Sequence, residues 1–297
     1  MTIIYPVKLN TFYQMIEQLC VHAKVKNTNS VFSKKMYGNV KLTFLVCYRE
    51  KLNVSYRRFV EICEENNILH MLCLTRMPHF TTLQKFVQRT PKKLFEKLVR
   101  VCRKLLNLNN IEASIDGTGF SNTNPSHHYI KRIDGVTVKN YTKTVFLADN
   151  KSKLILNVRT HSDHASETID FIPLVKELKG VLRAVLADKG YDSMKNRMFC
   201  ISNNIVPQIA FRQHTKSRKQ EFGTPSKRML LEKQFDEVAH RRRSLIESIN
   251  SAIKRTLGSY VNSKTAVNQQ KQVTIKAIAY NLEQIGRVLK IWLFIYC

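Results

Sequence analysis

The period of the hydrophobic pattern changes near residue 111, and the order of elements beyond that point restricts the fold of this chain most strongly. Up to about residue 107 the apolar residues recur at helical spacing, whereas Ile111–Asp116 alternates apolar and polar residues as a half-buried strand does. Further strands are predicted at 141–148, 154–160, 184–187 and 205–211, and helices at 167–178, 193–202, 235–257 and 274–296. This order predicts an α/β fold in which helices flank a mixed sheet, preceded by a mostly helical region.

The helical region and the α/β region are predicted to form separate domains, at 1–107 and 108–297. A length of 297 residues agrees with two domains of roughly 150 residues each. In the first domain, Pro78 separates a helix that contains Phe59 from a helix over 83–89, and basic residues lie on their outer sides. This pattern predicts a DNA-binding unit similar to a helix-turn-helix. The alternative is a plain helical bundle, which has similar features.

A formal net charge of +27 comes from 49 Lys and Arg residues against 22 Asp and Glu residues. Such a surplus makes a folded chain repel itself, and a polyanionic partner offsets the repulsion. The charge therefore predicts nucleic acid as the partner, and it disfavours an enzyme that acts on a small neutral metabolite.

Cysteine usage and both ends of the sequence predict a cytoplasmic, nucleoid-associated protein that does not enter a membrane. The seven cysteines, an odd number without a C-x-x-C pair, do not resemble a disulfide framework, so a reducing compartment is expected. Lys8 and Asn10 interrupt the first apolar stretch before a signal-peptide core forms. The apolar stretch 291–297 is far shorter than the roughly 20 residues of a membrane-spanning helix.

Asp116 and Asp188 stand at the predicted carboxyl ends of two strands, in a chain with few acidic residues. Open sheets place their functional residues at this edge. Gly117 and Gly190 lie close behind the two carboxylates, so the backbone can turn away and leave each side chain facing a cleft. A hard cation would favour a carboxylate placed directly after the apolar run 184–187. The alternative is that each Asp only caps the turn or helix that follows.

Glu247 is a third candidate, on the helix predicted at 235–257. At about 100° per residue, it shares a stripe roughly 60° wide with His240, Arg243 and Lys254, opposite an apolar side. The stripe places one carboxylate among basic groups. The alternative is a solvated face on which Arg243 and Glu247 pair across one turn.

Three carboxylates from two strands and a helix suffice to hold two metal ions about 3.5–4 Å apart. Such ions activate a water or a 3′-hydroxyl and stabilise the leaving oxygen in phosphoryl transfer. Neighbouring Lys and Arg side chains bind phosphates. Asp116, Asp188 and Glu247 are therefore predicted to be the metal ligands of a phosphoryl-transfer site.

Two loops are weaker candidates. His161, Asp163 and His164 follow the third predicted strand, but imidazole ligands favour Zn or Fe over Mg, so a polar loop is the expected reading. The basic stretch 212–228 is predicted either to follow the DNA backbone through phosphate contacts or to be a solvated insertion.

Three motifs follow one another along the chain: Ile115-Asp116-Gly-Thr-Gly-Phe120, Leu186-Ala-Asp188-Lys-Gly-Tyr191-Asp192 and His240-x2-Arg243-x3-Glu247-x6-Lys254. Together they resemble the DDE transposases of prokaryotic insertion sequences. The third motif of that family reads Tyr-x2-Arg-x3-Glu-x6-Lys, so His240 replaces the Tyr. The segment 126–132 is also similar, and the resemblance covers about residues 110–290.

This resemblance implies a ribonuclease-H-like catalytic fold, in agreement with the predicted order of elements. It implies that Asp116, Asp188 and Glu247 bind two Mg²⁺ or Mn²⁺ ions, and that the enzyme cleaves DNA at the ends of the insertion sequence and transfers the 3′-hydroxyl to target DNA. It also implies a homodimer that bridges two terminal inverted repeats in a synaptic complex. The DNA-binding residues expected by the resemblance are Arg243, Lys254, His240, Lys189 and Arg132. Packing is the alternative role of His240, and a place at the start of the next helix is the alternative role of Lys189.

Two other functions stay open at this point. One is a related metal-dependent nuclease that cuts DNA without strand transfer. The other is a non-catalytic DNA-binding protein derived from such an enzyme, which the presence of all three acidic residues disfavours.

Overall fold

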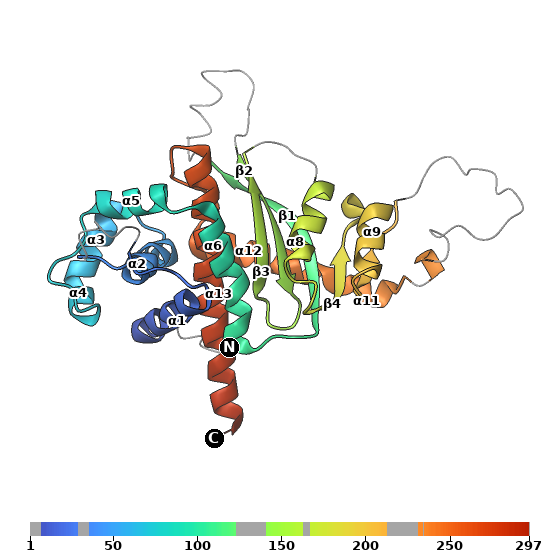
Figure 1. The fold of residues 1–297 in the computed structure, drawn as a ribbon, viewed down its shortest axis with the longest axis horizontal. Helices are drawn as coiled ribbons and strands as arrows, with labels where there is room; N and C mark the ends of the chain where they lie inside the picture. Colours follow the sequence, from blue (N-terminus) through green and yellow to red (C-terminus); the bar gives the residue numbers. More distant parts are fainter. Residues whose placement is uncertain are drawn as a thin grey trace, which may run out of the picture.

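The computed structural model describes residues 7–28, 36–122, 141–162, 167–212, 231–233 and 235–296, with side chains as far as Leu289. The centre of this part is a five-stranded mixed sheet in the order β3-β2-β1-β4-β5 (Figure 1). β1 is antiparallel to β2 and parallel to β4, β2 is antiparallel to β3, and β4 is parallel to β5. The strands are β1 (Ile111–Ser121), β2 (Tyr141–Asp149), β3 (Ile155–His161), β4 (Leu182–Ala187) and β5 (Val206–Ile209). The α/β class and the mixed sheet are confirmed.

The N-terminal region is helical, as predicted. Its elements are α1 (Leu9–His22), α2 (Asn39–Leu52), α3 (Tyr56–Glu65), α4 (Ile68–Met71), α5 (Phe80–Arg89), α6 (Lys92–Val101) and the 3-10 helix η1 (Cys102–Leu106). The Ser55 hydroxyl caps α3 by accepting a hydrogen bond from the backbone N–H of Arg58. α3 and α5 pack against each other. The helix predicted before Pro78 is divided into α3 and α4, because the backbone at Asn67 is left-handed. Binding of DNA by this region stays a prediction.

The remaining helices lie on the two faces of the sheet. They are η2 (Glu167–Asp170), α8 (Phe171–Lys176), η3 (Lys189–Tyr191), α9 (Met194–Ile201), α11 (Glu237–Arg241), η4 (Arg242–Ser244), α12 (Leu245–Leu257) and α13 (Ala266–Tyr296). Phe171 of α8 and Cys200 of α9 join the core on one face. Ile249 of α12 and Ile278 of α13 join the core on the other face. Among the described residues, none of these helices combines the length and apolar character that a membrane crossing requires.

One hydrophobic core connects the N-terminal helices to the sheet. Phe44 of α2, Leu98 of α6, Ile278 of α13 and Phe146 of β2 belong to the same buried cluster. In Figure 1, α13 runs between the N-terminal helices and the sheet. The predicted domain boundary at residues 107 and 108 lies in the turn before β1. Two separate folding units stay a prediction, because the packing joins the two parts through α13.

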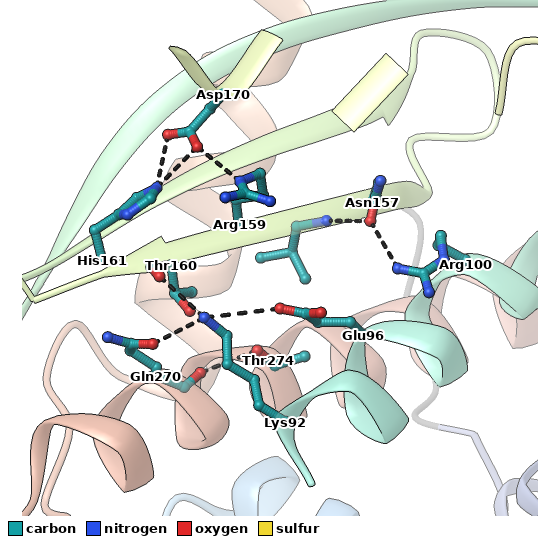
Figure 2. Close-up of polar contacts among 11 residues, drawn as sticks. Lys92, Glu96, Arg100, Asn157, Arg159, Thr160, His161, Asp170, Gln270 and Thr274 are labelled. Carbon is teal, nitrogen blue, oxygen red and sulfur yellow. Dashed lines mark hydrogen bonds and ion pairs between the residues drawn. The ribbon is translucent and has the colours of Figure 1, made fainter. Parts of the chain in front are cut away.

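Polar contacts hold both faces of the edge strand β3 (Figure 2). On one side, the Lys92 ammonium of α6 donates to the backbone oxygen of Thr160 at 3.0 Å and to the side chain of Gln270 at 2.8 Å. On the other side, Arg159 and His161 both contact the fully buried carboxylate of Asp170, each at 2.8 Å. Both faces of β3 are therefore tied to helices.

β1 is longer than predicted, and this changes the position of Asp116. Gly117–Ser121 continue the strand because they stay paired with 141–145 of β2, and this pairing outweighs the low strand preference of glycine. Asp116 therefore lies within β1 rather than at its end, which corrects the sequence-based expectation. Pairing with the parallel strand β4 nevertheless stops at Ile115.

Three predicted helices differ in their bounds. The predicted helix 235–257 is interrupted by η4, where Arg242 is fixed by Glu112 of β1. The predicted helix 167–178 begins as the 3-10 turn η2 and ends at Lys176. The last helix starts at Ala266 instead of 274 because its first turns bury polar residues, which hide the apolar pattern.

A buried ionic network joins α2, α12 and α13. The Glu50 carboxylate, only 1% exposed, lies 2.6 Å from Arg49 and 3.6 Å from the ammonium of Lys276. Gln272 also donates to Glu50, at 3.3 Å. Lys276 in turn donates to the backbone oxygen of Leu257, so it supplies a cation at the C-terminus of α12. This network fixes the end of the helix that carries Glu247.

Candidate active site

Asp116 and Asp188 occupy neighbouring positions on adjacent strands. The parallel register of β1 and β4 ends with Ile115 opposite Ala187, so Asp116 is the next residue of β1 and Asp188 is the first residue after β4. Adjacent strands are about 4.8 Å apart. Ile115 and Ala187 belong to the core on the α8 side, so the residue after each of them points to the face that α12 covers. The register therefore places Asp116 and Asp188 after two residues that are paired across β1 and β4.

α12 brings Glu247 and Lys254 to the same face. Asp116, Glu247, Asn250 and Lys254 line one open pocket of about 540 Å³, which we call the α12 pocket. Asp188 is not among its lining residues. The structure therefore joins two of the three predicted carboxylates in one cavity and places the third directly after the adjacent strand β4.

Arg243 holds the Glu247 carboxylate. The Arg243 Nη2 donates to Glu247 Oε1 at 2.9 Å, with Glu247 58% exposed and Arg243 21% exposed. This is the pairing across one turn that the sequence allows as the alternative. It leaves the second oxygen of an exposed carboxylate open to solvent, beside the α12 pocket.

Lys254 lies half-buried in the wall of the α12 pocket, with its ammonium 5.7 Å from the centre of the Phe120 ring. Burial lowers the pKa of Lys254 below that of a free lysine, and the nearby Asp116 carboxylate partly opposes this shift. The arrangement keeps a cation within reach of Asp116, which suits a site that binds phosphate.

Asn250 is a site residue that the sequence reasoning missed. Its Nδ2 donates to Asp116 Oδ2 at 3.1 Å, and it is only 8% exposed. Its Oδ1 is buried and has no hydrogen-bond partner among the described residues. Its position three residues after Glu247 on a helix is the signal that points to it.

His240 is anchored at the end of β4. Its Nε2 lies 3.0 Å from the backbone oxygen of Ala187, the residue before Asp188, and its ring lies 5.2 Å from that of Phe235. This contact is the packing role that the sequence leaves open for His240. Contact with DNA stays a prediction.

Glu112 is a second residue that the sequence reasoning missed. Its two oxygens accept from Nε and Nη2 of Arg242 at 2.7 and 2.8 Å, and Arg183 and Asn150 also contact it. The hydrogen bond from Arg242 is the main cause that holds the pKa of Glu112 below its usual value. The bidentate contact between Arg242 and Glu112 fixes η4, which contains Arg243 and precedes Glu247.

Glu112→Gln is expected to lower the stability by about 2 kcal/mol at pH 7, because a hydrogen-bonded ion pair is lost. Folding lowers the pKa of Glu112. The charged carboxylate therefore stabilises the folded chain fully at pH values above the pKa of Glu112 in the unfolded chain. This stabilisation is lost as the pH falls through the lower pKa of the folded chain. The melting temperatures of variant and wild type should therefore differ more at pH 7 than at pH 3. An equal difference at both pH values would contradict this role, and Glu177→Gln, at a weak exposed pair with Arg100, is the control.

Asp188 caps the turn that follows it, and several contacts fix that turn. Its Oδ1 accepts from the backbone N–H of Lys189 at 2.7 Å. Arg212 donates to the backbone oxygen of Lys189 at 2.8 Å, and Asp192 pairs with the buried Arg197 at 2.9 Å. The side chain of Lys189 is exposed. The capping alternative is thus observed for Asp188, and it leaves the other carboxylate oxygen for a further ligand.

The donor chemistry fits a hard divalent cation. The candidate oxygens come from Asp116, Asp188 and Glu247, joined by the unpartnered Oδ1 of Asn250, and hard cations prefer carboxylate and amide oxygens. Within the described ranges, no three His, Cys, Asp or Glu side chains converge closely enough to hold an ion. Glu247 is instead held by Arg243 and Asp188 by the amide of Lys189.

Several predicted residues lie elsewhere. Arg132, Asp163, His164 and nearly all of the basic stretch 212–228 fall outside the described residues. His161 points to Asp170 (Figure 2), on the sheet face opposite α12. It is therefore separated from Asp116 by the sheet.

Comparison with known proteins gives one family match. The family described as the transposase DDE domain matches residues 111–282, which is more than half of the chain. No curated protein matches this sequence. Among solved structures, the chain is similar to one described as a piggyBac transposase synaptic complex with hairpin DNA, with 9% sequence identity and a TM-score of 0.49, covering 95% of this chain and 75% of that chain.

Proposed function

This chain belongs to the DDE transposase family and is an enzyme of DNA transposition, and on that premise we propose that Asp116, Asp188 and Glu247 are its catalytic metal ligands. The observation that supports this assignment most directly is the α12 pocket, in which Asp116 and Glu247 face Lys254. The register of β1 and β4 also supports it, because Asp116 and Asp188 follow the paired residues Ile115 and Ala187. The family generally depends on divalent metals, and two Mg²⁺ or Mn²⁺ ions are the proposed cofactors.

Mg²⁺ or Mn²⁺ held by Asp116, Asp188 and Glu247 would activate a water or the 3′-hydroxyl of DNA and would stabilise the leaving oxygen of a phosphodiester. The residues of the chain orient these groups. Asn250 holds Asp116 through its Nδ2, and Glu112 fixes the turn from which Arg243 projects. In the proposed complex Arg243 exchanges the Glu247 carboxylate for a DNA phosphate, which frees Glu247 to bind metal.

The proposed DNA contacts extend beyond this pocket. Lys254 binds the phosphate near the cleaved bond, and Lys189, His240 and Arg132 contact the flanking backbone. The helical N-terminal region binds the terminal repeat. Two copies of the chain bridge two ends of the element, in the cytoplasm where the DNA lies.

The test is cleavage and joining of a supercoiled plasmid that carries the terminal repeats flanking the gene. We expect cleaved and joined products with Mg²⁺ or Mn²⁺, none with EDTA, and none from Asp116→Asn in either condition. Cleavage without joined products would favour the nuclease. Binding without any products in wild type would favour the non-catalytic DNA-binding protein.

A further inference from the structure

A second cavity lies between the N-terminal helices and the segment that joins α12 to α13. It has a volume of about 620 Å³, and we call it the α3–α5 pocket. α3 and α5 form one wall and residues 262–265 form the other, with Asn268 at the start of α13. A concave site of this size accepts a small-molecule-sized unit, whereas the grooves of a DNA duplex are read by an element that protrudes into them.

The basic group on the α3 wall is Arg57. Its guanidinium lies 4.9 Å from the centre of the Phe80 ring, and it has no carboxylate partner among the described residues. The neighbouring Arg58 is different, because it is paired with Glu61 and Glu65 at 3.0 and 3.2 Å. The planar guanidinium of Arg57 thus lies beside an aromatic ring without a carboxylate partner among the described residues. Nucleic-acid bases stack on guanidinium groups of this kind.

Amide side chains lie beside this platform. Gln84 and Gln88 are one turn apart on α5, both are exposed, and both line the α3–α5 pocket. Their side chains make no hydrogen bond to another described residue. Gln and Asn amides pair with base edges through a donor and an acceptor at once, so this wall is suited to read a base.

The opposite wall is prearranged. The Gln272 side-chain oxygen accepts from the backbone N–H groups of Asn262 and Ser263, at 3.0 and 3.1 Å. Lys271 donates to the backbone oxygens of Val87 and Gln88 at 3.0 and 2.8 Å, which ties the end of α5 to α13. Both walls are therefore fixed to the first turns of α13. Binding of a ligand then costs little conformational entropy of these walls.

The two pockets share one stretch of backbone. Ser259 lines the α12 pocket and Asn262 lines the α3–α5 pocket. Between them, Tyr260 forms a bridge to Ser121 at the end of β1, the strand of Asp116. Three residues of extended chain span roughly 10 Å, and nucleotides along one DNA strand rise by about 3.4 Å each. A strand cut in the α12 pocket would therefore reach the α3–α5 pocket within a few nucleotides.

We propose that the α3–α5 pocket binds an unpaired nucleotide of the DNA strand that flanks the cleavage site. Arg57 stacks on its base, Gln84 and Gln88 contact the base edge, and Lys264 on the opposite wall faces the phosphate. This assignment rests on the proposed function for the position of the strand, but the binding itself needs neither metal nor cleavage.

The test measures binding of two labelled DNA probes in EDTA by fluorescence anisotropy. One probe is a blunt 30-base-pair duplex, and the other is the same duplex with a ten-nucleotide single-stranded 3′ tail. Wild type is expected to prefer the tailed probe by about tenfold, the value of one stacked base. Arg57→Ala and the double variant Gln84→Ala/Gln88→Ala should lose this preference and bind the blunt probe as wild type does. Arg58→Ala is the matched control and should keep the preference.

The outcomes separate this inference from the proposed function. No preference in wild type, or an unchanged preference in both pocket variants, would overturn the α3–α5 assignment and leave the catalytic proposal standing. Equal losses on both probes would also overturn it, since they indicate a general phosphate contact. Cleavage by the Asp116→Asn protein is measured separately, and unimpaired cleavage by that protein would overturn the catalytic proposal alone.

Discussion

Glu247→Gln is expected to lower DNA cleavage by about a thousandfold or more while leaving the stability of the chain nearly unchanged. Loss of a charged metal ligand removes several kcal/mol of transition-state stabilisation, and about 1.4 kcal/mol corresponds to a factor of ten in rate. In the folded chain the same carboxylate is 58% exposed and makes a surface pair with Arg243, and such pairs contribute about 0–1 kcal/mol to stability. A large catalytic loss and a small stability loss are therefore expected together.

The matched control for this experiment is Glu237→Gln. Glu237 on α11 forms a similar pair across one turn with Arg241 at 3.8 Å, with side chains 77% and 75% exposed, but it does not line the α12 pocket. Cleavage of the supercoiled donor plasmid and thermal melting are measured for both variants. We expect the control to cleave like wild type. Wild-type cleavage by Glu247→Gln would exclude Glu247 as a ligand, and equal losses in both variants would assign the effect to the charge of the region.

The site could be predicted from the sequence where it depends on local periodicity. Helical spacing brings Glu247 and Lys254 to one stripe, and both line the α12 pocket. The apolar run before Asp188 predicts the end of β4, where the structure ends it. The role of Glu112 could not be predicted from the sequence, because its partner Arg242 is 130 positions away and no local pattern encodes such a contact.

The fold, too, could be predicted where it depends on local periodicity and not where it depends on distant contacts. The alternation of apolar and polar residues locates β2 and β3 to within one residue at each end. The end of β1 was predicted too early because the strand formed by its glycines depends on pairing with Tyr141 and its neighbours in β2. The start of α13 was predicted too late because Lys271 and Gln272 are buried polar residues, and their partners on α5 and α2 come from distant parts of the chain.

Glu50→Gln is expected to destabilise the whole chain by about 3–5 kcal/mol, which lowers the melting temperature by on the order of 10 °C. Glu50 is the one carboxylate between two buried cations, Arg49 and Lys276, which are 3% and 0% exposed. Removing its charge leaves both cations without an anion in a medium of low polarity. Because Lys276 also caps the end of α12, we expect the loss to reach the helix that carries Glu247 and to lower cleavage even below the melting temperature.

A double-variant cycle separates this charge effect from lost packing. Glu50→Gln/Lys276→Met removes one of the stranded cations, so it should be less destabilised than the sum of the two single variants. Glu61→Gln is the control, since its pair with Arg58 is more than half exposed and contributes about 0–1 kcal/mol. Thermal melting of the four proteins beside wild type gives the coupling directly. Additive losses of stability in the double variant would show that Glu50 acts through its shape alone. A small loss of stability for Glu50→Gln would mean that water reaches this network and that the network does not fix the end of α12.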